Sequence, residues 1–280
     1  MGDGLVQGKI LVMKVYIDSS DYIYNYTGKL SKTIILTEVP FLEPLFRPVK
    51  GFFKQIRVSP PIQDGLAKIP YYEVKRDSNG KVNYILKPVM LQGDYIIEVG
   101  GSQDIINDLE KAFKKSIGVR TRVKFENLVV SYIINNVFVV EPSIDLSSLV
   151  VLRTVSPALL SNPFVPNQHV RRFTVSPGVL LWIPYMISKD ILSSDVHEVQ
   201  RAVFKLESCL WEHYSVRQKT VMVNYDNARE PALLVKGKYV ISNKDEECKE
   251  IVREALIAAR VYGIGSSRAN GFGSIRVSGH

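Results

Sequence analysis

The stretch that decides the fold lies at the carboxyl end of the chain: Gly263–Val277, with the sequence GIGSSRANGFGSIRV. Glycine accepts a positive φ and lets another molecule approach the backbone closely. Successive amide N–H groups in such a loop can face phosphate oxygens, and an arginine can add a bidentate contact. The stretch is therefore a candidate anion-binding loop formed by Gly263, Gly265, Arg268, Gly271 and Gly273. A plain turn between a helix and a strand is the alternative.

The order of elements around the loop excludes two other phosphate-binding patterns. A helical pattern precedes the loop and a strand pattern follows it, which is the reverse of the dinucleotide-binding order. No Lys-Ser or Lys-Thr pair follows the last glycine, so the Walker A pattern is absent as well.

The composition is that of an ordinary globular protein with a basic excess. Of the 280 residues, 46% are hydrophobic and 23% charged, which suits one large or two smaller domains, and the net charge is +8. Between positions 29 and 57 basic residues outnumber acidic ones. The acidic residues are Glu38 and Glu43, and the basic residues are Lys29, Lys32, Arg47, Lys50, Lys54 and Arg57. A polyanion is the natural partner of such a segment, and a solvated basic face is the alternative.

The lack of a recognisable targeting signal and the small number of cysteines favour a cytoplasmic protein. No run of 18 apolar residues is present, so we expect no spanning helix and no membrane partner. The first residues lack the basic and apolar regions of a signal peptide. Cys209 and Cys248 are too few for a disulfide framework, and their apolar helical settings favour buried thiols. No residues show convincing metal-ligand spacing, so we expect neither a metal nor a cofactor.

The hydrophobic pattern predicts two halves with the same order of elements. In the first half, strands are expected at 9–17, 53–59, 95–99 and 123–140, helices at 28–37 and after Ser102, and a hairpin turn at 77–80. In the second half, strands are expected at 149–153, 220–225, 232–242 and after the loop, and helices at about 194–214 and from Asn243 to the loop. Residues 173–184 are apolar but interrupted.

Each half thus follows the β-α-β-β-α-β order of ferredoxin-like domains. The best linker is 141–145, which divides the chain into domains 1–142 and 143–280. We therefore predict an α+β fold of tandem ferredoxin-like (RRM-like) domains, with the glycine-rich loop 263–273 in the second domain.

The loop pattern Gly-Ile-Gly-x-x-Arg-x-x-Gly-Phe-Gly-x-Ile-x-Val resembles the signature loop of the RAMP proteins of CRISPR systems, in particular their repeat-processing endoribonucleases. Proteins of that family have two ferredoxin-like halves and carry the loop before the last strand. The resemblance implies that the chain binds the repeat of a precursor CRISPR RNA and cuts it once without a metal. Attack by the 2′-hydroxyl would leave a 2′,3′-cyclic phosphate and a 5′-hydroxyl, and positioning and electrostatics can supply most of that catalysis.

The chain departs from the many family members that place a catalytic histidine in the amino-terminal half, because its histidines are at 169, 197, 213 and 280. It resembles the archaeal members that lack this histidine, which assigns catalysis to Lys29, Lys32, Lys54 and Arg268. Crowded cations lower one another's pKa, so one lysine can accept a proton while another stays charged. Tyr26 is a weaker candidate for the base, because a phenol has a pKa near 10.

Further arginines are candidate RNA contacts. The resemblance makes Arg229 a counterpart of the catalytic cations in the second half. Arg171 and Arg172 stand beside Phe173, and basic and aromatic side chains together bind unpaired nucleotides. A surface loop explains these two equally well. Trp182 and Trp211 lie in apolar contexts, so both are expected in the core.

Two other function classes stay open at this point. One is a non-catalytic RNA-binding RAMP subunit of a CRISPR interference complex, and the other is a basic α+β protein that binds a phosphorylated small molecule or a protein. The sequence leaves open the repeat bound, the cleavage position, the general base, and whether the chain forms a homodimer or joins an interference complex.

Overall fold

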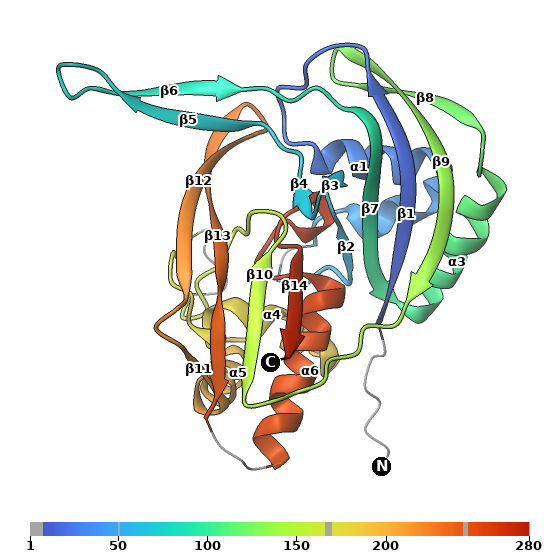
Figure 1. Cartoon of the computed structure of the whole chain (residues 1–280). Helices are drawn as coiled ribbons and strands as arrows, with labels where there is room; N and C mark the ends of the chain where they lie inside the picture. The colour runs from blue at the N-terminus through green and yellow to red at the C-terminus, as the bar shows by residue number, and fades with distance from the viewer. Residues whose placement is uncertain (1–7, 50, 166–169, 243–245, 280) are drawn as a thin grey trace.

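The computed structural model contains two antiparallel sheets, each with helices on one face (Figure 1), and it describes residues 8–49, 51–165, 170–242 and 246–279. The first sheet has the order β4-β3-β7-β1-β9-β8, with β2 also paired to β7. Its strands are β1 (Gly8–Ser19), β2 (Ile56–Val58), β3 (Ile62–Gln63), β4 (Leu66–Ala67), β7 (Gln92–Ser102), β8 (Arg120–Phe125) and β9 (Leu128–Val140). Its helical segments are α1 (Gly28–Glu38), η1 (Pro40–Leu42), α2 (Glu43–Phe46) and α3 (Gln103–Lys115).

The second sheet has the order β14-β10-β13-β12-β5-β6, with β11 also paired to β13. Its strands are β5 (Tyr71–Arg76), β6 (Val82–Lys87), β10 (Leu149–Thr154), β11 (Leu210–Glu212), β12 (Arg217–Tyr225), β13 (Ala228–Ile241) and β14 (Ile275–Gly279). Its helical segments are α4 (Pro177–Ser188), α5 (Val196–Cys209), α6 (Glu246–Tyr262) and η2 (Arg268–Asn270).

The strand orders confirm the predicted tandem ferredoxin-like fold. In each half the last strand of the motif lies beside the first, followed by the third and the second: β9-β1-β7-β2 and β14-β10-β13-β12. The predicted hairpin around 77–80 is also present as β5 and β6. It extends the second sheet, however, because Tyr71 and Tyr72 pair with Val223 and Met222 of β12. The first half thus lends two strands to the second, and the boundary at 142/143 stays a prediction.

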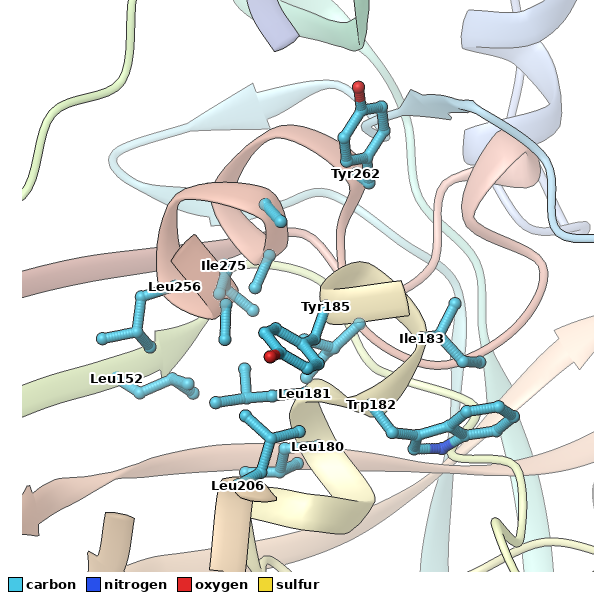
Figure 2. Packing of buried hydrophobic residues seen from close by; sticks show 14 of the residues in the cluster. Leu152, Leu180, Leu181, Trp182, Ile183, Tyr185, Leu206, Leu256, Tyr262 and Ile275 are labelled. Atoms are coloured by element: carbon cyan, nitrogen blue, oxygen red, sulfur yellow. The ribbon is translucent and has the colours of Figure 1, made fainter. Parts of the chain in front are cut away.

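Helix α4 occupies part of the region that the sequence presents as interrupted apolar runs. Every residue of α4 is buried, including Pro184 inside the helix and Trp182, which is 1% exposed. Figure 2 shows Leu180, Leu181 and Tyr185 of this helix close to buried residues of other elements, such as Leu206 and Leu256. A helix that is apolar all round has no amphipathic period, so the hydrophobic pattern alone could not identify it. The prediction that Trp182 lies in the core is confirmed.

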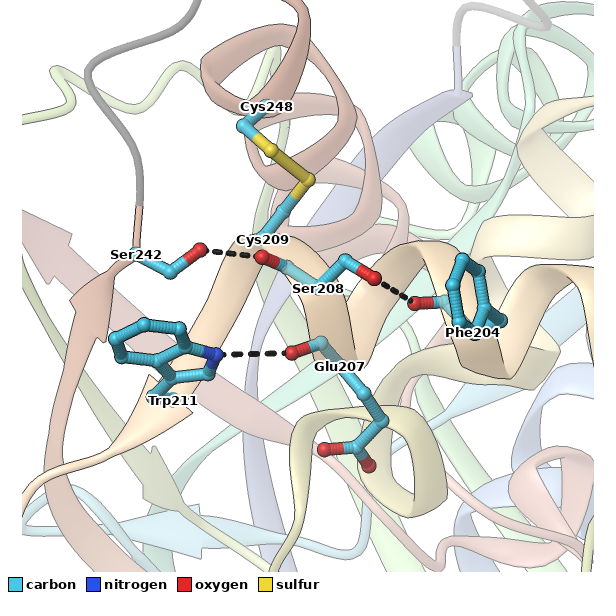
Figure 3. The surroundings of a disulfide bond; sticks show 7 residues. All are labelled: Phe204, Glu207, Ser208, Cys209, Trp211, Ser242 and Cys248. Atoms are coloured by element: carbon cyan, nitrogen blue, oxygen red, sulfur yellow. Dashed lines mark hydrogen bonds between the residues drawn. A yellow bond between two sulfur atoms is a disulfide. The ribbon is translucent and has the colours of Figure 1, made fainter.

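The predicted long helix ends five residues early, at Cys209, because Leu210–Glu212 turn into β11 and pair with β13. The expectation that Trp211 lies in the core is wrong, since its side chain is 54% exposed. Its indole Nε1 donates to the Glu207 carbonyl at 3.0 Å, which holds the ring against the end of α5 (Figure 3). Asn243, where the last helix was expected to start, lies outside the described residues.

The two cysteines are not thiols, contrary to the prediction. Cys209 ends α5, Cys248 lies near the start of α6, and the two form a disulfide with their Cα atoms 5.1 Å apart (Figure 3). Helical periodicity correctly predicted that both cysteine side chains lie on the apolar faces of their helices. It could not show that the ends of these two helices meet. Since intracellular disulfides are rare outside hyperthermophiles, the cysteines give no support to the predicted compartment. In the part of the chain that the structure describes, no helix has the length and apolar character needed to cross a membrane.

The contact between the halves contains a buried cluster of charges. Glu98 of β7 is 2% exposed, and its carboxylate accepts hydrogen bonds from Arg57 of β2 at 3.3 Å, Arg260 of α6 at 2.9 Å and Arg276 of β14 at 2.7 Å. Arg57 is fully buried and therefore belongs to the interior, not to the basic surface that its segment suggested. Gly100 lets β7 approach α6 closely, since a Cβ at this position would lie 1.8 Å from the Val261 carbonyl oxygen.

The charges keep one another ionised despite their burial. Burial raises the pKa of Glu98, but the attraction of Arg57 and the other two guanidinium groups outweighs it and holds this pKa well below its usual value. Burial lowers the pKa of Arg57 to about 10, which leaves it charged at neutral pH. The cluster is a fully bonded ion network, the arrangement in which buried charges persist.

Replacing Glu98 by glutamine should lower the free energy of unfolding by about 3 kcal/mol or more, because three buried or partly buried arginines lose the counter-charge that they share. Urea denaturation measures this change. The depressed folded-state pKa also sets the pH dependence: the contribution of Glu98 is complete above its unfolded value of 4.5 and declines as the pH falls below it. Glu250→Gln, which breaks an exposed pair with Arg253, is the matched control and should cost less than about 1 kcal/mol. Equal effects of the two substitutions would contradict the central role of Glu98.

Candidate active site

The glycine-rich loop is folded back on the protein. All four of its glycines are buried with positive φ, from 69° at Gly273 to 101° at Gly271. Added Cβ atoms would collide with backbone, at 1.9 Å from the Ile264 oxygen for Gly273 and 2.5 Å from the Leu159 oxygen for Gly265. Glycine is therefore required here for both conformation and packing.

Most backbone amides of the loop donate within the protein, not toward a ligand. Ile264 N–H binds the Gly273 oxygen, Ser266 N–H binds the Leu159 oxygen, and Gly273 N–H binds the Pro157 oxygen, at 2.8 to 2.9 Å. The amides of Gly263 and Gly271 also have internal acceptors. Contacts of Gly263, Gly265, Gly271 and Gly273 with RNA stay a prediction, and a direct amide cradle for phosphate has few free donors.

Arg268 is an internal tie between the loop and the strand region before β2. It is 5% exposed, and its guanidinium donates to the carbonyls of Tyr262 at 3.2 Å and Lys54 at 2.9 Å. Burial lowers its pKa to about 10. This placement suits a residue that fixes the backbone of Lys54, so the predicted catalytic role of Arg268 stays untested and would be indirect.

Helix α1 begins directly against the loop. A Cβ on Gly28 would lie 2.1 Å from the Asn270 carbonyl oxygen and 2.6 Å from the Gly271 Cα atom. Just before it, Tyr26 stacks on Phe272 with ring centroids 4.1 Å apart and donates its hydroxyl to the Gly271 carbonyl at 3.1 Å. Burial raises the pKa of Tyr26 far above that of an ordinary phenol, which argues against a role as base.

The structure brings the three predicted lysines to one region beside this contact. Lys29 pairs with Asp226 and lies 4.8 Å from the centroid of the Tyr225 ring. Lys32, one helical turn on, lies 5.2 Å from the Phe46 ring centroid, and Lys54 donates to the Phe46 carbonyl. Partial burial lowers the pKa of each lysine, and the charge of Lys32 lowers the pKa of Lys29 and Lys54 further.

Three polar residues of the site went unnoticed in the sequence. Tyr225 ends β12, its hydroxyl accepts from Asn270 at 2.8 Å, and Asp226 follows it with a positive φ of 55°. The turn between β12 and β13 is only two residues long, whereas the strands expected at 220–225 and 232–242 left the six residues 226–231 between them. The change from apolar to polar residues at the end of β12 could have located this turn in the sequence. Nothing in the sequence, however, indicated that Asp226 lies against Lys29.

The predicted arginines are spread around this region. Arg171 donates to the Ser266 hydroxyl at 2.8 Å and thus contacts the loop. Arg172 lies 5.4 Å from the Phe164 ring centroid, and Arg229 lies 4.8 Å from the Tyr84 ring centroid of β6. Arg171 is therefore bonded to the glycine-rich loop, whereas Arg172 and Arg229 pack on aromatic rings outside it.

No described histidine belongs to this region. His197 is exposed in the first turn of α5, and His213 follows β11, where its Nδ1 lies 3.0 Å from the Ser215 hydroxyl. His169 and His280 lie outside the described residues. Within those residues, no group of three or more histidine, cysteine, aspartate or glutamate side chains could hold a metal ion.

Comparison with known proteins adds a likeness of fold. No family model and no curated protein sequence matches the chain. A solved Cas6 product complex superposes with a TM-score of 0.62 at 13% identity, covering 96% of this chain and 99% of that one. Cas6 of Thermus thermophilus (TM-score 0.57, 10% identity, 97% and 98% covered) and a Cas6-related protein of Pyrococcus furiosus (0.57, 13%, 96% and 98%) match similarly. The chain therefore has the fold of these proteins over nearly its whole length.

Gly28→Ala tests whether α1 and the loop depend on direct backbone contact. The backbone of Gly28 has no positive φ, so any loss comes from the collision with Asn270 and Gly271 alone. We expect the free energy of unfolding to fall by about 1–3 kcal/mol, measured in urea. Gly101→Ala, whose Cβ would have no neighbour nearer than 3.5 Å, is the control and should be nearly neutral. A neutral Gly28→Ala would mean that the contact is loose.

Proposed function

We propose that the protein is a CRISPR repeat-processing endoribonuclease that binds precursor CRISPR RNA and cuts within the repeat. The observation that carries this proposal is the gathering of Lys29, Lys32 and Lys54 beside the glycine-rich loop, in a chain with the Cas6 fold. One of the superposed Cas6 structures is a product complex, so that fold accommodates a cleaved product in that protein. The loop pattern at Gly263–Val277 supports the same assignment.

In the proposed reaction the RNA supplies the nucleophile. The 2′-oxygen before the cut forms a bond to phosphorus while the bond from phosphorus to the 5′-oxygen breaks, which gives a 2′,3′-cyclic phosphate and a 5′-hydroxyl. A neutral lysine amine takes the 2′-hydroxyl proton, and a charged ammonium stabilises the phosphorane and donates a proton to the leaving oxygen. None of these steps calls for a metal ion.

The environment of the lysines suits both protonation states. Partial burial favours the neutral amine, while the remaining charge of a neighbouring lysine faces the phosphate. Lys29 forms an ion pair with Asp226, so a substrate phosphate must displace that carboxylate to bind the Lys29 ammonium group. Because the Asp226 side chain is mostly exposed, water can solvate its carboxylate once it is displaced.

Alanine substitution of Lys29, Lys32 or Lys54 should slow cleavage by on the order of 10²-fold each, as for the loss of one transition-state donor. The substrate is a 5′-labelled repeat RNA from the host array, incubated in EDTA, and product ends are identified by mass. Lys111→Ala on α3, an exposed lysine of another surface, is the control and should leave the rate unchanged. An RNA with a 2′-deoxy residue before the cut should bind without being cut. Tight binding with no cleavage of the normal RNA would instead favour the non-catalytic RNA-binding subunit.

The cleavage rate should also decline with rising pH earlier than an ordinary lysine predicts. The pKa of Lys29 lies below its usual 10.5, so the stabilising ammonium is lost as the pH rises through that lowered value. Lys29→Arg keeps its charge and should shift the alkaline decline to higher pH, after subtraction of uncatalysed RNA hydrolysis. An unchanged pH profile in this variant would exclude Lys29 as the group that titrates.

A further inference from the structure

Two hairpin turns, one from each half, meet at the start of α1. The turn between β8 and β9 begins with Glu126, and the turn between β12 and β13 begins with Asp226. Both residues have a positive φ of 55°, which two-residue hairpin turns favour at their first position. Each turn thus brings one acidic side chain to the segment around Asn25 and Lys29.

Asn25 is bonded to both turns. It is 6% exposed, and its Nδ2 donates to Glu126 Oε1 at 2.6 Å. Its Oδ1 accepts from the backbone amides of Tyr26 at 2.8 Å and Asp226 at 3.2 Å. The reverse orientation of the amide would point its NH2 group at two N–H donors, so these partners determine how the side chain is oriented. One buried asparagine therefore ties a turn of each half to the start of α1.

Lys29 interacts with both acidic residues but pairs with one of them. It forms an ion pair with Asp226, whereas in the described part of the chain no ion pair joins it to Glu126. Glu126 acts at longer range: burial lowers the pKa of Lys29, the charge of Glu126 opposes that change, and the charge of Lys32 adds to it. The Tyr225 ring against the ammonium group is uncharged at neutral pH, because burial raises its pKa.

The bond from Asn25 accounts for this difference between the two carboxylates. Glu126 Oε1 accepts from an amide that is itself buried and bonded on its other side, so this carboxylate is fixed. Asp226 is bonded to Asn25 only through its backbone amide, which leaves its carboxylate free to pair with Lys29. Once a phosphate displaces Asp226, Glu126 remains near Lys29, and a released Glu126 would compete with that phosphate.

We propose that Asn25 is a positioning residue that holds Glu126 away from Lys29, so that the ammonium group stays available for the scissile phosphate. This task requires an amide side chain, because an amide offers an N–H donor to the carboxylate and an oxygen acceptor to the backbone amides. An aspartate would lack the donor, and an alanine would lack both groups. The proposal rests on the proposed function for the phosphate, whereas the effect of Asn25 on Lys29 can be measured without RNA.

The pKa of Lys29, followed by NMR in the protein without RNA, tests the first part of the proposal. In Asn25→Ala the released Glu126 should pair with Lys29 and raise this pKa by about 0.5. In Asn25→Ala/Glu126→Gln, and in Glu126→Gln alone, the pKa should lie at or below the wild-type value, because the charge that favours the ammonium form is gone. Asn224 Nδ2 donates to the Tyr24 carbonyl at 2.8 Å and should keep the β12–β13 turn docked in these variants. An unchanged or lower pKa in Asn25→Ala would overturn the proposal.

Binding of the 2′-deoxy repeat RNA in 0.1 M salt tests the second part. Asn25→Ala should bind about 5- to 10-fold more weakly than the wild type, which corresponds to the loss of one phosphate contact. Adding Glu126→Gln should restore most of that affinity, because the competing carboxylate is gone. In the wild-type background Glu126→Gln should change the affinity by less than about twofold, since Asn25 already holds the carboxylate away. An equal effect of Glu126→Gln in both backgrounds would show that Asn25 acts without Glu126, and the proposal would be wrong.

The matched control is Asn135→Ala, which removes an exposed amide–carboxylate bond to Asp94 and should change neither measurement. If Asn25→Ala does not fold, Glu126→Gln alone decides: a lower Lys29 pKa with nearly unchanged affinity supports the proposal, and weaker binding overturns it. RNA that binds to the wild type without being cut would reject the proposed function and leave these comparisons in force. Failure of the wild type to bind the RNA would also reject the proposed function, and the Lys29 pKa would then decide the role of Asn25.

Discussion

A single buried carboxylate links elements of both halves of the molecule. Glu98 binds arginines from β2, α6 and β14, so one side chain joins the first sheet to the helix and the strand that flank the glycine-rich loop. Arg57 strengthens the same junction, because it also donates to the Val261 carbonyl at 2.8 Å and the Ser274 hydroxyl at 2.9 Å. Both ends of the loop are thereby fixed to the first half, and the position of the loop against α1 follows from that.

The loop in turn arranges the lysines without touching most of them. Its glycines let it approach Gly28 and the Leu159 backbone closely, and Arg268 holds the carbonyl of Lys54. The chemistry that we propose therefore depends on side chains from the first half positioned by a loop from the second. This arrangement explains why the proposed active site needs both ferredoxin-like halves, and why a glycine-rich segment lies in the interior, where only glycine fits the close backbone contacts.

The sequence predicted what depends on local pattern and missed what depends on distant contacts. Alternating strands, amphipathic helices and the loop produced the tandem ferredoxin-like order, which the sheets confirm. Helix α4 was missed because it is buried on all sides, and the pairing of β5 with β12 because register between halves has no local signal. Arg57 and Arg268 looked like surface cations, since nothing near them in sequence announces Glu98 or the carbonyl acceptors of Arg268. The lysines were predicted from resemblance, and their catalytic role remains a prediction.

The most direct test of this account is a crystal structure of the protein bound to a repeat RNA that carries a 2′-deoxy residue before the cut. We predict that the scissile phosphate lies within hydrogen-bond distance of Lys29 or Lys54, beside the junction of α1 and the glycine-rich loop, with Asp226 released from Lys29. A scissile phosphate bound elsewhere, with the Lys29–Asp226 pair intact, would contradict it.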